Sequence, residues 1–237
     1  MEANAPAGRR RLGVIVPSSN TVAEVDFARA SPPDVTVHIA RMYLAETTAE
    51  AEHRMLRDHL PQAAADLGSA HPEVVVFSCT SAAALLGDRG EEDLVTGLAQ
   101  TTGARIVSTN AAVASALAPS GRRVAVLTPY VQELTEAIGA SLVERGFELG
   151  KVLGLGMSDN FAIGQVTPDA IIDIVMTEFE GESFDALFVS CTNFRAMETI
   201  PTLEGRLGRQ VVSSNDAAFG AAMNLLSAEG AAVGGAP

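Results

Sequence analysis

The sequence predicts an α/β protein built from two similar Rossmann-like domains with parallel sheets, related by pseudo-two-fold symmetry. Short apolar runs alternate with longer stretches whose apolar residues recur at helical spacing, which is typical of parallel strands joined by crossover helices. The runs are almost continuous in Val, Ile and Leu, as expected of strands covered on both faces. The whole pattern occurs twice, which favours an internal duplication.

The elements of the first half follow from these runs in order. Their apolar residues predict strands at 11–17, 34–40, 73–79 and 104–109. The stretches between them predict helices at 23–30 and 50–70.

The second half repeats this order. Apolar runs predict strands at 122–129, 147–156, 185–191 and 209–214, and helical spacing predicts helices at 131–146 and 168–181. Pro17 and Pro129 close the first strand of each half, and Cys79 and Cys191 close the third. Both pairs lie 112 positions apart (129 − 17 and 191 − 79).

The repeat sets the expected domain boundary. We expect an N-terminal α/β domain at 1–118 and a C-terminal α/β domain at 119–237. A C-terminal helix at about 215–228 could pack back onto the first domain.

Composition narrows the function classes. The formal net charge of −13, the absence of Trp and the presence of only two Tyr argue against a nucleic-acid partner. No apolar run reaches the length of a membrane span, so we expect no membrane association and a cytoplasmic protein. In that compartment, two cysteines are expected to be thiols rather than a disulfide.

Cys79 and Cys191 are the two cysteines of the chain, and they are the candidate catalytic residues. Ligands of open parallel sheets bind at the carboxyl ends of the strands, so two facing sheets would place both thiols on opposite walls of one cleft. Each is followed by Thr and an expected helix start, which would lower the thiol pKa. The alternative is the usual role of a free cysteine as a small buried apolar residue.

Polar residues near the strand ends form the candidate substrate site. Turn N–H groups and hydroxyls at two facing turns suit a small dicarboxylate, although some of these residues are also good helix caps. The candidates are Asn20, Tyr130, Asn160, Thr80, Ser81, Thr192 and Asn193. Thr21, with Glu24 three residues later, predicts a capping box at the start of helix 23–30.

Other chemistries have little support in the sequence. The four histidines all fall in the first half, away from the strand ends that carry cysteine, at His38, His53, His59 and His71. The chain has no zinc-type spacing of Cys and His and no glycine-rich phosphate loop. We therefore expect neither a metal nor a cofactor.

These residues resemble the aspartate/glutamate racemase superfamily, and within it the maleate cis–trans isomerases. The resemblance runs from about Leu12 to about Leu226 and rests on the segments VPSSNT, SCTSA, TPY, DNF and SCTN. Arylmalonate decarboxylases are similar as well, but they typically lack the first cysteine, which this chain keeps as Cys79.

The resemblance implies a cofactor-independent isomerase that converts maleate to fumarate. Cys79 would add to the alkene, and Cys191 would act as the acid/base partner. Asn20, Tyr130 and Asn160 would hold the carboxylates, while the turns after each cysteine would supply N–H groups and hydroxyls. We also expect a homodimer or a higher homo-oligomer.

Three alternatives remain open at this point. An amino-acid racemase would use the two thiols as opposed bases on one carbon. A related enzyme of the superfamily could act in the degradation of a compatible solute such as ectoine. The third alternative is a non-catalytic protein that binds a carboxylate at the same site and does not react with it.

Overall fold

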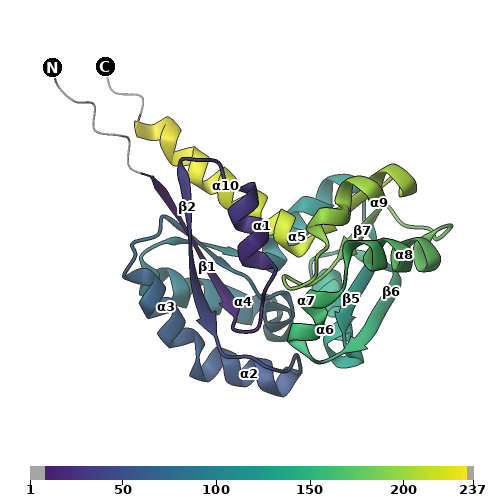
Figure 1. Cartoon of the computed structure of the whole chain (residues 1–237), viewed down its shortest axis with the longest axis horizontal. Helices are drawn as coiled ribbons and strands as arrows, with labels where there is room; N and C mark the ends of the chain where they lie inside the picture. Colours follow the sequence, from purple (N-terminus) through teal and green to yellow (C-terminus); the bar gives the residue numbers. More distant parts are fainter. Residues whose placement is uncertain (1–8, 234–237) are drawn as a thin grey trace.

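The computed structural model describes residues 9–233, which form two four-stranded parallel sheets. The first sheet has the strand order β2-β1-β3-β4 and the second the equivalent order β6-β5-β7-β8, so the predicted duplicated α/β fold is confirmed (Figure 1). The strands are β1 (Arg10–Pro17), β2 (Val35–Met42), β3 (Val74–Phe77), β4 (Arg105–Ser108), β5 (Arg123–Tyr130), β6 (Glu148–Met157), β7 (Ala186–Val189) and β8 (Gln210–Ser213).

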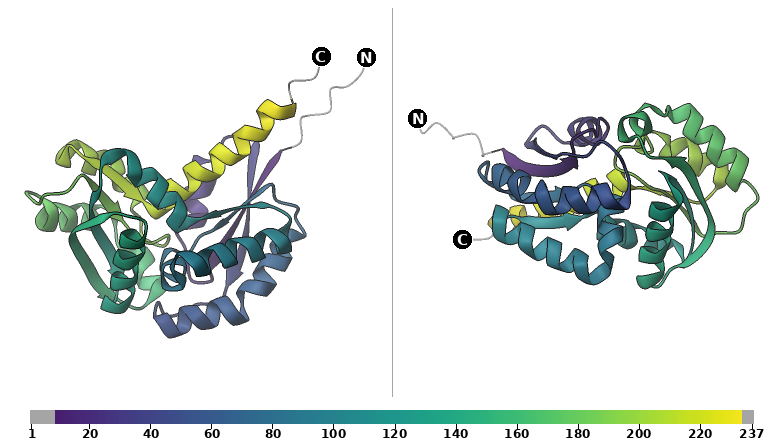
Figure 2. Two further views of the ribbon diagram at one scale, coloured as in Figure 1. Left: turned by 180° about the vertical axis from the view of Figure 1, so that it is seen from behind. Right: turned by 90° about the horizontal axis from the view of Figure 1, so that it is seen from below.

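Helices cover the faces of both sheets (Figures 1 and 2). The first half contains α1 (Ala23–Ala30), α2 (Ala49–Asp58), α3 (Leu60–Gly68), α4 (Thr80–Thr102) and α5 (Thr109–Leu117). The second half contains α6 (Gln132–Glu144), α7 (Asn160–Gln165), α8 (Pro168–Phe179), α9 (Ile200–Leu207) and α10 (Ser214–Val233).

Burial follows the position of each strand in its sheet. Every residue of β3 and β7 is buried, whereas the edge strands β2 and β6 are mostly half-buried. Neighbouring residues of a strand point to opposite faces, so Ile15 packs under α3 and α4 while Val14 packs toward Phe27 of α1. The cluster that contains Val14 continues into the second sheet, so the two halves share one of their hydrophobic cores.

Several helices differ from the sequence prediction. The helix expected at 50–70 is divided into α2 and α3 at His59, because Pro61 cannot donate within a continuing helix and instead occupies the first turn of α3. The sequence predicted a helix start after Cys79 but not the length of α4, and it predicted no helix at the positions of α5 and α7. The helix α4 is interrupted at Gly87, whose φ of 64° and ψ of 175° are non-helical.

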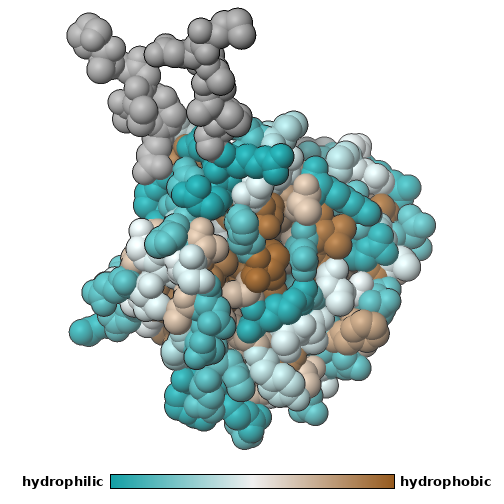
Figure 3. All heavy atoms as spheres, turned by 60° about the vertical axis from the view of Figure 1, so that its left-hand side comes forward, coloured by the Kyte–Doolittle hydropathy of each residue, from teal (hydrophilic) through white to brown (hydrophobic). Residues whose placement is uncertain are grey.

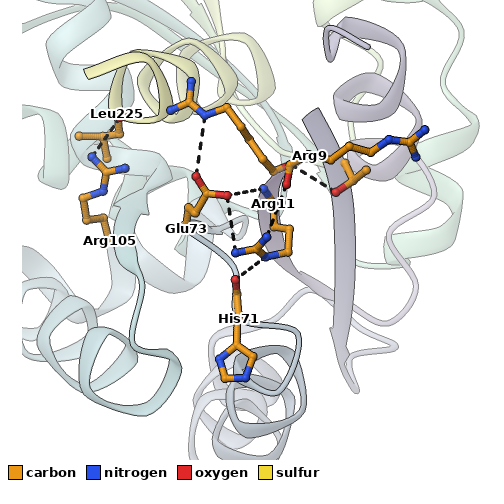
Figure 4. Close-up of polar contacts among 8 residues, drawn as sticks. Arg9, Arg11, His71, Glu73, Arg105 and Leu225 are labelled. Carbon is orange, nitrogen blue, oxygen red and sulfur yellow. Dashed lines mark hydrogen bonds and ion pairs between the residues drawn. The ribbon is translucent and has the colours of Figure 1, made fainter. Parts of the chain in front are cut away.

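The C-terminal helix α10 packs against α5, α1 and the first sheet (Figure 1). The Arg105 guanidinium at the start of β4 donates to the carbonyl of Leu225 in α10 over 3.0 Å (Figure 4). Beside it, Glu73 accepts from the backbone N–H of Arg11 over 2.9 Å. The Arg105 contact ties the part of α10 around Leu225 to the start of β4, at the end of the strands that lies away from the cysteines. The division into domains at 118/119 stays a prediction.

The surface is largely hydrophilic on the face in Figure 3, with hydrophobic residues gathered near its middle. Large exposed apolar side chains include Tyr43 and Phe161, which are 65% and 56% exposed. Within residues 9–233, no helix combines the length and the apolar character needed to cross a bilayer.

Candidate active site

The two cysteines lie at equivalent carboxyl ends of the two sheets. Cys79 comes two residues after β3, and Cys191 comes two residues after β7. Both are free thiols with only 4% of their surface exposed. They are also close enough for the charge of one thiolate to raise the pKa of the other. The fold therefore brings two residues that are 112 positions apart into one buried site.

Cys79 is the N-cap of α4, with an extended backbone at φ −149° and ψ 99°. The sequence predicted that a helix start would lower its pKa, and a hydrogen bond from the Ala82 backbone does act in that direction. Burial outweighs this contribution, and the nearby Glu52 carboxylate adds to it, so the pKa lies well above its usual value near 9. The expected lowering of the Cys79 pKa by the helix start is therefore wrong for this state.

Cys191 has a different backbone. A turn, and not a helix, follows Cys191 in the chain. Cys191 itself adopts a φ of 100°, which non-glycine residues rarely take. The predicted helix start is therefore wrong at this position. The turn lets the Asn193 backbone N–H donate to the Cys191 sulfur over 3.2 Å. Burial raises the pKa of Cys191 to about 12, and hydrogen bonds from Tyr130 and Asn193 lower it only in part.

Tyr130 closes β5 with 2% of its surface exposed. Burial, together with its contact with Cys191, raises the pKa of the phenol well above its ordinary value, so the hydroxyl keeps its proton. The structure thus places a buried phenol donor beside Cys191.

Asn20 lies in the turn between β1 and α1. Its Oδ1 accepts from the backbone N–H groups of Val22 and Ala23 over 3.0 Å each. Thr21 therefore does not form the predicted capping box, because Asn20 already satisfies the first donors of α1. The Asn20 amide nitrogen donates to Thr192 Oγ1 across the two halves over 3.1 Å, which leaves one of its two hydrogens for a ligand.

Asn160 and Asn193 form the second set of contacts between the halves. Asn193 Oδ1 accepts from the Thr21 backbone N–H over 2.8 Å, and its Nδ2 donates to the Asn160 carbonyl over 2.5 Å. Asn160 is the first residue of α7 rather than a loop residue, and its Nδ2 donates to Ser19 Oγ over 2.8 Å. These asparagines hold the two halves together around the site.

Thr80 and Ser81 are buried in the first turn of α4. Thr80 Oγ1 donates to Ser214 Oγ over 2.9 Å, and Ser214 Oγ in turn accepts from the Cys191 backbone N–H over 3.0 Å. Ser214 was not a candidate from sequence, although its place directly after the last strand of the second half was a usable signal. It links the two cysteine turns.

Glu52 is a buried carboxyl beside Cys79 that the sequence did not single out. It lies in the first turns of α2, is fully buried, and accepts from the Ser81 hydroxyl over 2.5 Å. Burial raises its pKa from about 4.5 to about 8, and the Ser81 hydrogen bond acts in the opposite direction. Nothing in the segment EAEH distinguished this carboxyl from the exposed Glu50.

Comparison with known proteins places this site in a family. The model of the family described as arylmalonate decarboxylase matches residues 12–236. The chain belongs to this family. A maleate isomerase of Nocardia farcinica is 28% identical over 87% of this chain and 86% of its own length. Because these relatives are named as enzymes, the prediction that the chain is an enzyme is confirmed.

Solved structures share the fold over almost the full length. The maleate isomerase of Pseudomonas putida S16 with maleate has a TM-score of 0.85 and 26% identity, and covers 92% of each chain. A mutant of the Nocardia farcinica maleate cis–trans isomerase with a covalently bound succinylcysteine intermediate has a TM-score of 0.85 and 24% identity, covering 92% of this chain and 93% of that one. The sequence predicted a resemblance to the maleate isomerases, with the arylmalonate decarboxylases as relatives. This prediction is confirmed.

Proposed function

We propose that the protein is a cofactor-independent isomerase that converts maleate to fumarate through an adduct on Cys79. The observation that carries the proposal is the pair of free, buried thiols at duplicated strand ends, close enough to interact. The similarity to maleate isomerases supports the substrate, and the succinylcysteine captured in the Nocardia farcinica enzyme supports a cysteine adduct on this fold.

In the proposed reaction, the Cys79 sulfur adds to one alkene carbon of maleate. The π electrons move onto the neighbouring carbon and its carboxylate, so the former double bond becomes a single bond that can rotate. After rotation, the electrons return, the C–S bond breaks, and the more stable trans alkene leaves. Every bond that forms is broken again, so the step needs no oxidant or reductant.

Cys191 suits the assisting role because its neighbours are donors. The Tyr130 phenol and the Asn193 backbone N–H both hydrogen-bond its sulfur. In our proposal, Cys191 gives its proton to the carbon that carries the developing negative charge. The two donors then stabilise the thiolate that remains, which is the type of fixed stabilisation that enzymes use most effectively. After the rotation, the Cys191 thiolate takes that proton back, so that the electrons of the C–H bond re-form the double bond as the C–S bond breaks.

The carboxylates of the substrate need donors on both walls of the site. Asn20 retains one amide hydrogen after its contact with Thr192, and the turns after each cysteine offer backbone N–H groups. We propose that these groups, with Asn160, hold the two carboxylates while the central bond rotates.

Proton NMR of the purified protein with maleate tests this function. The olefinic signal of maleate should disappear while that of fumarate grows, and the Cys79→Ala protein should leave maleate unchanged. The same samples with aspartate and glutamate in deuterium oxide test the racemase. If deuterium enters the α-carbon of an amino acid while maleate stays unchanged, the protein is a racemase and the proposed isomerase function is wrong.

A further inference from the structure

The proposed reaction needs a proton acceptor for Cys79. Its thiol is neutral in the folded protein because burial raises its pKa well above 9, whereas the attacking species must be a thiolate. The thiol therefore has to lose its proton as the sulfur adds to the substrate. A group that accepts this proton must lie within reach, directly or through one hydroxyl.

Glu52 and Ser81 provide such a route. The Ser81 hydroxyl lies 4.0 Å from the Cys79 sulfur and donates to Glu52 Oε1 over 2.5 Å. The sulfur contact is long, as catalytic hydrogen bonds often are before a ligand tightens the site. All three side chains are buried, so water does not compete for the proton.

The surroundings of Glu52 do not explain its carboxyl as part of an ion pair. The Ser81 hydrogen bond is what favours its charged form, and no cationic side chain within the described residues offsets its burial. Its second oxygen, Oε2, has no hydrogen-bond partner in that part of the chain. The titratable groups whose charges interact with Glu52 are Cys79, Cys191 and Tyr130. Burying a carboxyl without a cationic partner lowers the stability of the folded protein, and a purely structural role would not offset this loss.

We propose that Glu52 accepts the proton of Cys79 through the Ser81 hydroxyl when the sulfur attacks. The S–H proton passes to Ser81 Oγ, and the hydroxyl proton of Ser81 passes to Glu52 Oε1, while the sulfur electrons form the C–S bond. When the adduct breaks down, the same protons return and the thiol is restored. The route deepens the proposed function. Glu52 acts through Ser81 and does not itself touch the reacting atoms.

The simpler reading of Glu52 makes the opposite prediction. If its carboxylate acts on Cys79 only through its charge, it raises the pKa of the thiol, and removing the charge should make Cys79 more reactive. If Glu52 accepts the proton, removing it should make Cys79 less reactive. The sign of the effect therefore distinguishes the two roles.

Alkylation of Cys79 by iodoacetamide measures this sign without any substrate. In a Cys191→Ser background, the rate should rise with pH through about 8, where Glu52 loses its proton. Adding Glu52→Gln should slow alkylation near that pH by about tenfold or more and move the rise toward the higher pKa of Cys79 itself. A faster reaction in the Gln protein would overturn the proposal.

Ser81→Ala supplies a second and independent test. This substitution leaves the Glu52 charge in place but removes the hydroxyl through which the proton passes. The relay predicts a similar loss of reactivity, and no further loss when both substitutions are combined. Reactivity that remains at the parent level in the Ala protein would refute the route, even if the Gln protein failed to fold.

Glu50→Gln is the matched control, because Glu50 lies on the same helix with 89% of its side chain exposed. It should alkylate like the parent protein. If Glu52→Gln slows alkylation while the unmodified protein leaves maleate unchanged, the relay stands and the proposed substrate fails. If maleate is isomerised but Glu52→Gln and Ser81→Ala react like Glu50→Gln, the relay fails alone.

Discussion

At the scale of single residues, Cys79 and Cys191 occupy matching places but have different chemistry. Cys79 caps a long helix in an extended conformation and contacts Ser81, which leads to a carboxyl group. Cys191 adopts a φ of 100° and receives hydrogen bonds from Tyr130 and Asn193. One thiol therefore has a proton acceptor nearby and the other has donors, which suits an attacking sulfur and an assisting acid.

This asymmetry predicts unequal effects of substitution. Cys79→Ala should abolish turnover of maleate because no nucleophile remains. Cys191→Ser should keep a trace of activity, because a hydroxyl can still hydrogen-bond but is a poor acid/base near neutral pH. Steady-state kinetics by NMR checks both proteins. Equal residual rates would show that the thiols have equivalent roles.

Burial of Glu52 also predicts the pH dependence of stability. Its pKa is about 8 in the folded protein and near 4.5 in a model peptide, so the folded state binds a proton that the unfolded chain has lost. The free energy of unfolding should therefore fall as the pH rises from about 4.5 to about 8. Asp26, whose burial raises its pKa to about 6, adds to the fall at the lower end.

Urea unfolding of the parent and Glu52→Gln proteins at several pH values measures this contribution. The Gln protein should lose less stability than the parent between about pH 6 and pH 8, since it has no carboxyl to ionise there. The Glu50→Gln protein serves as the control and should follow the parent. Parallel curves for the parent and Glu52→Gln would contradict the assigned pKa.

At the scale of elements, the short helix α7 sets the position of the Cys191 turn. Its first residue, Asn160, accepts from the Asn193 amide. About one helical turn later, the buried Gly164 lies against the same amide and against Thr21. A β-carbon added at Gly164 would lie 2.8 Å from Thr21 Oγ1 and 3.0 Å from Asn193 Oδ1.

Gly164→Ala should therefore lower kcat/KM for maleate, because it displaces the turn that carries the Cys191 donors. A shift of this kind can cost about a hundredfold in rate. Gly220→Ala in α10 is the matched control, since an added β-carbon there meets no atom within 4 Å. Kinetics at equal folded fraction, verified by circular dichroism, decide the outcome. A Gly164→Ala protein with the parent activity would show that α7 does not set the position of the Cys191 turn.

The sequence predicted most elements but not all of their limits. Strands were recognisable because buried parallel strands read as continuous apolar runs. The break between α2 and α3 was missed although Pro61 marked it, because apolar spacing continues on both sides. The helix start after Cys79 was predicted, but the length of α4 was missed because Gly87 and other glycines interrupt its pattern.

The chemistry of the site was predictable only where local sequence determines it. The duplicated strand ends identified both cysteines. The positive φ of Cys191 and the carboxyl beside Cys79 depend on packing between distant segments, since Glu52 and Ser81 lie 29 positions apart. The high thiol pKa values likewise follow from burial, which a local motif does not reveal.

At the scale of the whole molecule, the described state is closed around the site. The segment between β2 and α2 reaches across to the second half, where the Thr47 N–H donates to the Ser158 carbonyl over 2.7 Å. The backbones of Glu46 and Asp159 form an isolated antiparallel β-bridge there. Because both thiols are almost fully buried, we expect a substrate to enter only when contacts of this kind open.

Hydrogen–deuterium exchange should detect this closure. Maleate should slow exchange in peptides that cover 43–48 and 157–165, because the bound ligand favours the closed state. Peptides from α9, which do not cross between the halves, should exchange at the same rate with and without maleate. Unchanged exchange in the first two regions would show that entry does not require their separation.

The most direct test of the central claim is mass spectrometry of the Cys191→Ser protein after incubation with maleate. We predict a mass increase equal to one substrate molecule, located on the peptide that contains Cys79. Without Cys191, the adduct carbon takes its proton from solvent, and no thiolate is present to remove that proton and release fumarate. An unmodified Cys79 peptide in this protein, together with an adduct on Cys191 in the parent, would contradict it and reverse the roles of the two thiols.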